Sequence, residues 1–104
     1  MTIAKTPEPP YYAVIFTSTQ SADTEGYSAM AEQMVALAEQ QPGYLGIESA
    51  RQDVGITVSY WRDLESIKHW KNNATHLVAQ ETGKSRWYEN YTTRIALVER
   101  DYSK

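Results

Sequence analysis

The sequence predicts an α+β fold of the ferredoxin-like type, in which helices cover one face of a four-stranded antiparallel sheet. Three observations lead to this prediction. Apolar, β-branched segments lie near both ends of the chain, a helical period follows the first of them, and two more strand patterns are joined by a short turn. With a second helical region before the last strand, the predicted order is β-α-β-β-α-α-β.

The first strand is predicted over residues 11–18, after a proline-rich segment. Alternate residues of a strand point to opposite faces, and here neither face is polar, so both should be covered. One face consists of Tyr12, Val14 and Phe16, and the other of Tyr11, Ala13 and Ile15.

A helix is expected next, with Asp23 or Thr24 as its N-cap and residues 41–43 (Gln-Pro-Gly) as its end. Two strands follow at residues 44–51 and 56–61, and the short turn between them makes an antiparallel hairpin.

The second helical region is predicted as two helices. Asp63 caps a short helix that ends near residue 71, Asn72 and Asn73 break it, and Thr75 caps a longer helix. The last strand runs from Thr92 to about residue 100, and its centre is apolar on both faces. Since helices on one side leave the other face of the sheet bare, we expect that face to pack against a second copy in a homodimer.

Size and composition limit the classes of partner. The 104 residues make one domain, predicted as a mobile tail over residues 1–10 and a folded domain over residues 11–104. The chain has no cysteine, no signal-peptide pattern and no apolar run near the about 18 residues of a membrane span, so a cytoplasmic protein without a membrane partner is expected. A net charge of -3 with scattered basic residues argues against binding to nucleic acid.

A candidate ligand site lies in the second half of the chain. A set of residues recurs there at steps of three and four, so a continuous helix would place them on one face. They are His76, Ala79, Gln80, Gly83, Trp87, Asn90 and Tyr91. This face is polar and aromatic, and Gly83 leaves a gap in it, which suits a flat organic ligand better than tight packing.

Each candidate residue could instead have a purely structural role. His76 is either an acid-base group near neutral pH or a packed histidine hydrogen-bonded to backbone or Gln80. Trp70 and Trp87 either line a pocket or anchor the core, and Tyr91 either contacts a phenolic ligand or reaches water. His69 is expected to be solvated, and its spacing from His76 is not that of a metal site.

Several residues follow the pattern of a known family. They are residues 42–50 (PGYLGIESA) and 58–61 (VSYW), with Trp70, His76, Ala79-Gln80, Trp87-Tyr88 and Arg94-Ile95. In these the chain resembles the antibiotic biosynthesis monooxygenase domain family, over nearly everything after the tail. The resemblance implies a dimeric α+β barrel. It also implies oxidation of aromatic compounds by molecular oxygen without metal or flavin, or else binding and cleavage of haem.

The haem branch of the family is disfavoured by two departures. Trp61 and Trp70 match its tryptophan pair, but the position of the iron-ligating histidine, ten residues beyond Trp70, is Gln80, and the first strand has no asparagine.

The resulting hypothesis is a cofactor-independent monooxygenase for a small aromatic or polyphenolic compound, with no metal. His76 would be the base, and the substrate would contact Trp70, Gln80, Gly83, Trp87 and Tyr91. The alternative is a non-catalytic dimeric module that binds a similar ligand.

Overall fold

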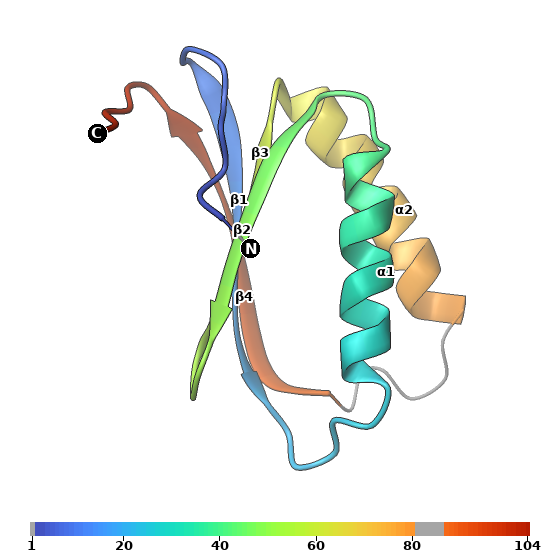
Figure 1. Ribbon diagram of the computed structural model, residues 1–104. Coiled ribbons are helices and arrows are strands. Elements are labelled where there is room, and N and C mark those ends of the chain that lie inside the picture. The colour runs from blue at the N-terminus through green and yellow to red at the C-terminus, as the bar shows by residue number, and fades with distance from the viewer. Residues whose placement is uncertain (1, 81–86) are drawn as a thin grey trace.

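Two helices cover one face of a four-stranded antiparallel sheet in the computed structural model, which describes residues 2–80 and 87–104 and, for residues 76–80, the backbone alone (Figure 1). The elements are β1 (Tyr11–Gln20), α1 (Tyr27–Glu39), β2 (Tyr44–Arg51), β3 (Gly55–Trp61), α2 (Leu64–Gln80) and β4 (Tyr88–Val98). The strand order is β2-β3-β1-β4 and every neighbouring pair is antiparallel. The predicted ferredoxin-like α+β fold is therefore confirmed.

Short-range chemistry explains where the helices begin and end. Asp63 caps α2 as predicted, because its Oδ1 accepts a hydrogen bond from the Ser66 backbone N–H at 2.8 Å. The predicted cap of α1 is wrong: the helix begins after Gly26, which has φ +81° and makes no side-chain cap bond. Gly43, at φ +83°, stands just after α1, and a Cβ there would lie 2.0 Å from the Ser66 hydroxyl oxygen.

The predicted break at Asn72 and Asn73 is also wrong, since α2 is continuous through both. The Asn73 side-chain amide donates to the His69 carbonyl at 2.9 Å and to Gln41 Oε1 at 3.3 Å. These bonds satisfy the amide inside a helix, so the weak helix propensity of asparagine does not decide the outcome.

The prediction that one helical face continues as far as Tyr91 is wrong as well. Trp87 is not helical, and Tyr88–Val98 forms β4. The physical reason is the length of β1, which pairs with β4 from Tyr11 as far as Gln20, opposite Tyr88. Backbone groups of β1 beyond the end of β3 need this partner, and strand pairing overrides the local periodicity.

The core lies between the helices and the Trp61 end of β3. Trp61 is 0% exposed, Ala38 1% and Ile67 4%. Tyr12, Val14, Tyr44 and Trp70 pack against them. The indole N–H of Trp61 donates to the Ser59 hydroxyl at 2.9 Å. The alternation predicted for the first strand is thus confirmed, with Tyr12 and Val14 on the face covered by the helices.

The other face of the sheet, here called the open face, is partly covered by the N-terminal segment. The Ala4 N–H donates to Glu48 Oε2 at 2.9 Å, and the Thr6 hydroxyl donates to the Tyr11 hydroxyl at 2.9 Å. The Tyr60 hydroxyl donates to Glu48 Oε1 at 2.6 Å, so both carboxylate oxygens of Glu48 are occupied. The mobility of residues 1–10 in solution stays a prediction. In the part of the chain that the structure describes, no helix is long and apolar enough to cross a membrane.

Candidate functional site

Three of the predicted site residues, all aromatic, are distributed over two separate aromatic groups. Trp70 belongs to the core, where its ring stacks on Trp61 at 5.7 Å and 22° between planes. Trp87 is 6% exposed, donates its indole N–H to the Glu25 carbonyl at 2.7 Å, and meets the Tyr27 ring edge-on at 5.8 Å. Trp70 and Trp87, both predicted to contact the substrate, therefore lie in different aromatic groups.

Three other predicted residues are placed in less detail. His76 and Gln80 lie in the last turns of α2, and their side chains are outside the description. Gly83 lies outside the described residues altogether. Their assignment as base and ligand contacts stays a prediction.

A second aromatic group, here called the tyrosine cluster, is formed where α1 begins and β1 meets β4. It consists of Phe16, Tyr27, Trp87, Tyr88 and Tyr91. Tyr88 lies at its centre, with ring centroids 5.3 Å from Phe16, 5.7 Å from Tyr27 and 6.1 Å from Tyr91. Tyr91 is 66% exposed, so one edge of the cluster is open to solvent. Of the predicted contacts, the structure brings Trp87 and Tyr91 to this cluster.

Arg51 extends the tyrosine cluster with a positive charge. Its side chain leaves the end of β2, crosses β3 and bonds to Ser18 on β1: one N–H reaches the carbonyl oxygen at 3.4 Å and another reaches the hydroxyl. The guanidinium carbon lies 5.8 Å from the centre of the Tyr27 ring, a cation-π distance. Ser18 is 3% exposed and Arg51 is partly buried.

The sequence analysis missed Arg51, Tyr27 and Tyr88 as site residues. A signal existed for the arginine, because a hairpin over residues 44–61 places Arg51 opposite Gly55 and on the same face as Trp61. No local pattern connects Arg51 with Ser18, which is 33 residues away in the chain.

Burial strengthens the preference of the central tyrosine for its neutral form. Burial, and then the neighbouring Tyr27 hydroxyl, raise the pKa of Tyr88 well above its ordinary value of 10.0, and the charge of Arg51 acts in the opposite direction. Tyr88 is a neutral phenol at physiological pH, as a tyrosine of ordinary pKa also is. It can donate a hydrogen bond to a negatively charged oxygen.

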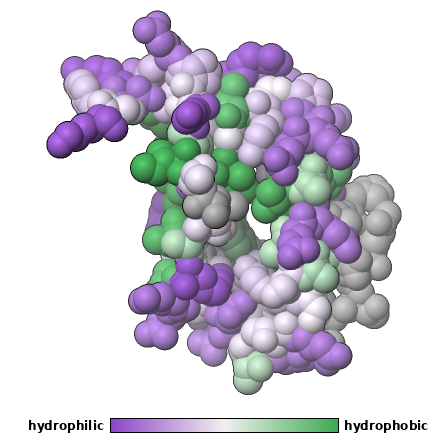
Figure 2. Space-filling model, in the orientation of Figure 1, coloured by the Kyte–Doolittle hydropathy of each residue, from purple (hydrophilic) through white to green (hydrophobic). Residues whose placement is uncertain are grey.

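The space-filling view shows an opening between the sheet layer and the helix layer, with hydrophobic side chains gathered beside it (Figure 2). Within the described part of the chain, the buried apolar residues are few: Tyr11, Ala13, Met30, Ala38, Trp61, Ile67 and Trp87. Among the described residues, the closest packing between the two layers is around Trp61.

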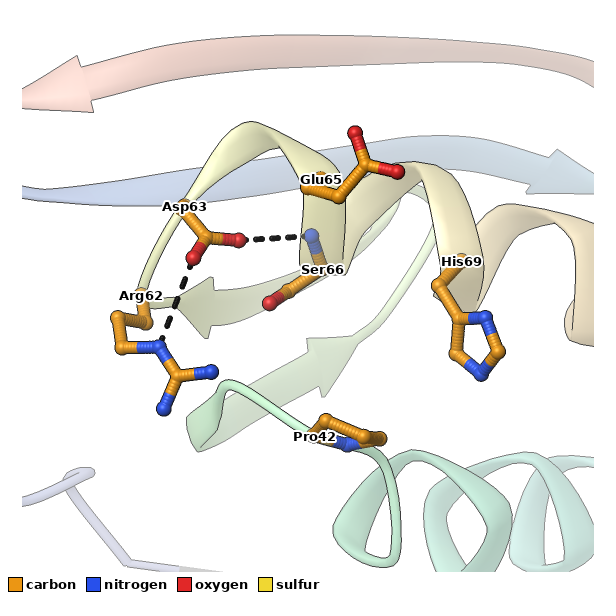
Figure 3. Close-up of a pocket in the computed structure, with 6 residues that line it drawn as sticks. All are labelled: Pro42, Arg62, Asp63, Glu65, Ser66 and His69. Carbon is orange, nitrogen blue, oxygen red and sulfur yellow. Dashed lines mark hydrogen bonds and ion pairs between the residues drawn. The ribbon is translucent and has the colours of Figure 1, made fainter.

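A separate hollow of about 300 Å³ lies at the start of α2 (Figure 3). It is lined by Pro42, Arg62, Asp63, Glu65, Ser66 and His69. Hydrogen bonds from Ser66, which Asp63 accepts as the helix cap, lower the pKa of that carboxyl, and Arg62 lies 3.5 Å from it. His69 is exposed, as expected. Asp63 and Ser66 serve the helix terminus, and His69 is the one lining residue with an aromatic ring.

Comparison with known proteins places this chain in a family. Residues 10–82 match the family model of antibiotic biosynthesis monooxygenases. The chain is 53% identical over 100 residues to the uncharacterized protein YqjZ of Bacillus subtilis, covering 94% of this chain and 88% of YqjZ.

Solved structures agree on the fold. SnoaB, a cofactor-independent oxygenase from Streptomyces nogalater, has a TM-score of 0.62 at 10% identity, covering 91% of this chain and 97% of SnoaB. A variant of MhuD with two manganese protoporphyrins bound per active site has a TM-score of 0.68 at 17% identity, covering 89% of this chain and 99% of MhuD. The fold, the family model and the close relative lead to one conclusion: the chain belongs to the antibiotic biosynthesis monooxygenase family.

Proposed function

We propose that this protein is a cofactor-independent monooxygenase that oxidises a small aromatic or polyphenolic compound with molecular oxygen. The observation that supports the proposal is the tyrosine cluster, in which aromatic rings meet edge-on around the neutral phenol of Tyr88. SnoaB, described as a cofactor-independent oxygenase, has the same fold. Since one fold hosts several activities, the site carries the argument and the fold only supports it.

The reaction makes three demands on the protein. The substrate must be deprotonated, its anion must be stabilised, and water must be kept away while the anion reduces oxygen. His76 is the proposed base. Tyr88 is the proposed hydrogen-bond donor to the anion, and the rings of Trp87 and Tyr91 are proposed substrate contacts. Gln80 and Gly83 stay predicted contacts, while Trp70 has a packing role against Trp61.

Oxygen uptake tests the proposal directly. With anthrone as substrate, one oxygen atom of O₂ becomes the new carbonyl of anthraquinone and the other leaves as water, with all four electrons supplied by the substrate. We expect enzyme-dependent uptake of one O₂ per anthrone, undiminished by a chelator and without added flavin. Quenching of ligand fluorescence without oxygen uptake would instead support the non-catalytic binding module. A Soret band that survives gel filtration after haem is added would support a haem protein.

We also propose that the protein is a homodimer. β4 is an edge strand, and its side chains Ile95 and Leu97 are 52% and 48% exposed on the face that the helices cover elsewhere. Ile56 is 46% exposed on the open face. Exposed apolar residues on both faces of one sheet suit a two-fold interface.

Light scattering at micromolar concentration should therefore give about twice the chain mass of 11.9 kDa. The double variant Ile95→Asp with Leu97→Asp should be monomeric, because two carboxylates would be desolvated at the interface. Val54→Asp is the matched control, since Val54 is 48% exposed in the turn between β2 and β3. A wild-type protein that stays a monomer at every concentration would contradict the dimer.

A further inference from the structure

We propose that Arg51 binds the carboxylate of an aromatic acid, so that the ligand of the tyrosine cluster carries a permanent negative charge next to its ring. The proposal rests on the proposed function for the aromatic part of the ligand, and it adds the chemical class. Three observations support it: the free donors of Arg51, the way in which its side chain is held, and the rings around it.

Arg51 has more hydrogen-bond donors than its protein partners use. A guanidinium has five N–H donors, and both bonds that Arg51 makes go to Ser18. Within the described part of the chain, no carboxylate forms an ion pair with Arg51. A partly buried cation without an anion is unfavourable, and an anionic ligand would relieve this cost.

The guanidinium occupies the space that a side chain at position 55 would fill, because residue 55 is glycine. A Cβ at Gly55 would lie 2.2 Å from Cζ and 2.2 Å from Nη2 of Arg51, so the side chain crosses β3 directly over the Gly55 backbone. Its far end is bonded to Ser18 on one side and lies beneath Tyr27 on the other. Such a fixed fork binds a ligand with less loss of conformational freedom than a mobile surface arginine.

The surroundings favour a flat carboxylic acid over other anions. The planar fork of a guanidinium matches the two oxygens of a carboxylate. The rings of Tyr27 and Tyr88 lie 5.7 Å apart beside it, at right angles, and supply both stacking and edge contacts for an aromatic body. Arg51 lies near enough to Tyr88 for its positive charge to oppose the rise in the pKa of that hydroxyl.

Binding of 2-naphthoate, compared with its neutral analogue 2-naphthamide, tests the proposal by calorimetry without any turnover. The wild-type protein should bind the acid at least about tenfold more tightly than the amide. Arg51→Met should remove this preference, and Arg51→Lys should keep only part of it, because lysine keeps the charge but loses the fork. Arg62→Met is the control, since Arg62 is an exposed arginine at the start of α2.

A second variant keeps the test informative if Arg51→Met fails to fold. Gly55→Ala leaves the charge in place but forces the guanidinium away from its position, so it should weaken naphthoate binding about tenfold and leave naphthamide binding unchanged. Folding of each variant is checked by circular dichroism. Equal binding of naphthoate by wild type, Arg51→Met and Gly55→Ala would overturn the proposal.

The same measurements separate this inference from the proposed function. Selective naphthoate binding that depends on Arg51, without oxygen uptake for any aromatic substrate, would support the anchor and contradict only the monooxygenase. Oxygen uptake with neutral quinols, combined with no preference for naphthoate, would support the monooxygenase and contradict only the anchor.

Discussion

Replacing Trp61 with alanine is expected to lower the free energy of unfolding by about 3–5 kcal/mol. Trp61 is 0% exposed and packs between Ala38 and Ile67, with Trp70 stacked on its ring. The truncation removes the largest fully buried side chain of the described residues and leaves a cavity that the stiff sheet below cannot fill. Urea unfolding at a fixed protein concentration measures the change.

Trp61→Phe is the matched control for this variant. It keeps most of the buried ring but loses the hydrogen bond from the indole N–H to the Ser59 hydroxyl. We therefore expect a smaller loss, about 1–3 kcal/mol, from the unpaired polar group and the missing ring atoms. A loss below about 1 kcal/mol for Trp61→Ala would show that the core lies elsewhere.

Replacing His76 with alanine is expected to reduce oxygen uptake by about 10²–10⁴-fold, the usual contribution of a general base. Folding should be unaffected, and the binding of a neutral aromatic ligand should change little. An imidazole accepts a proton only in its neutral form, so the wild-type rate should also fall as the pH is lowered through the imidazole range. The initial rate of oxygen uptake, measured from pH 5 to pH 9, tests both effects.

His69→Ala is the control, because His69 lies on the same helix and its side chain is exposed at the hollow near Pro42. It should keep the wild-type rate and pH profile. A His76→Ala protein that consumes oxygen at the wild-type rate would contradict the assignment of the base, while the aromatic site of the tyrosine cluster would be unaffected by that result.

Strands and faces were predictable because their signals are local. The two-residue period of β1 places Tyr12 and Val14 on the covered face, and the structure confirms it. The hairpin of β2 and β3 and the Asp63 cap depend on a few neighbouring residues, so turn and capping preferences were sufficient. Such rules act within about one turn or one strand pair, and they predicted the fold class correctly.

Only the tertiary structure determined where α2 and β4 begin and end and which residues make up the site. Asn73 is accepted within α2 because Gln41, 32 residues earlier, accepts its amide hydrogen, and residues from Tyr88 onward form a strand because β1 extends far enough to pair with them. Arg51 joins Tyr27 and Ser18 only once β1, β2 and α1 are assembled. Residue periodicity describes one element at a time, whereas these contacts depend on where three elements meet, which is a property of the folded chain.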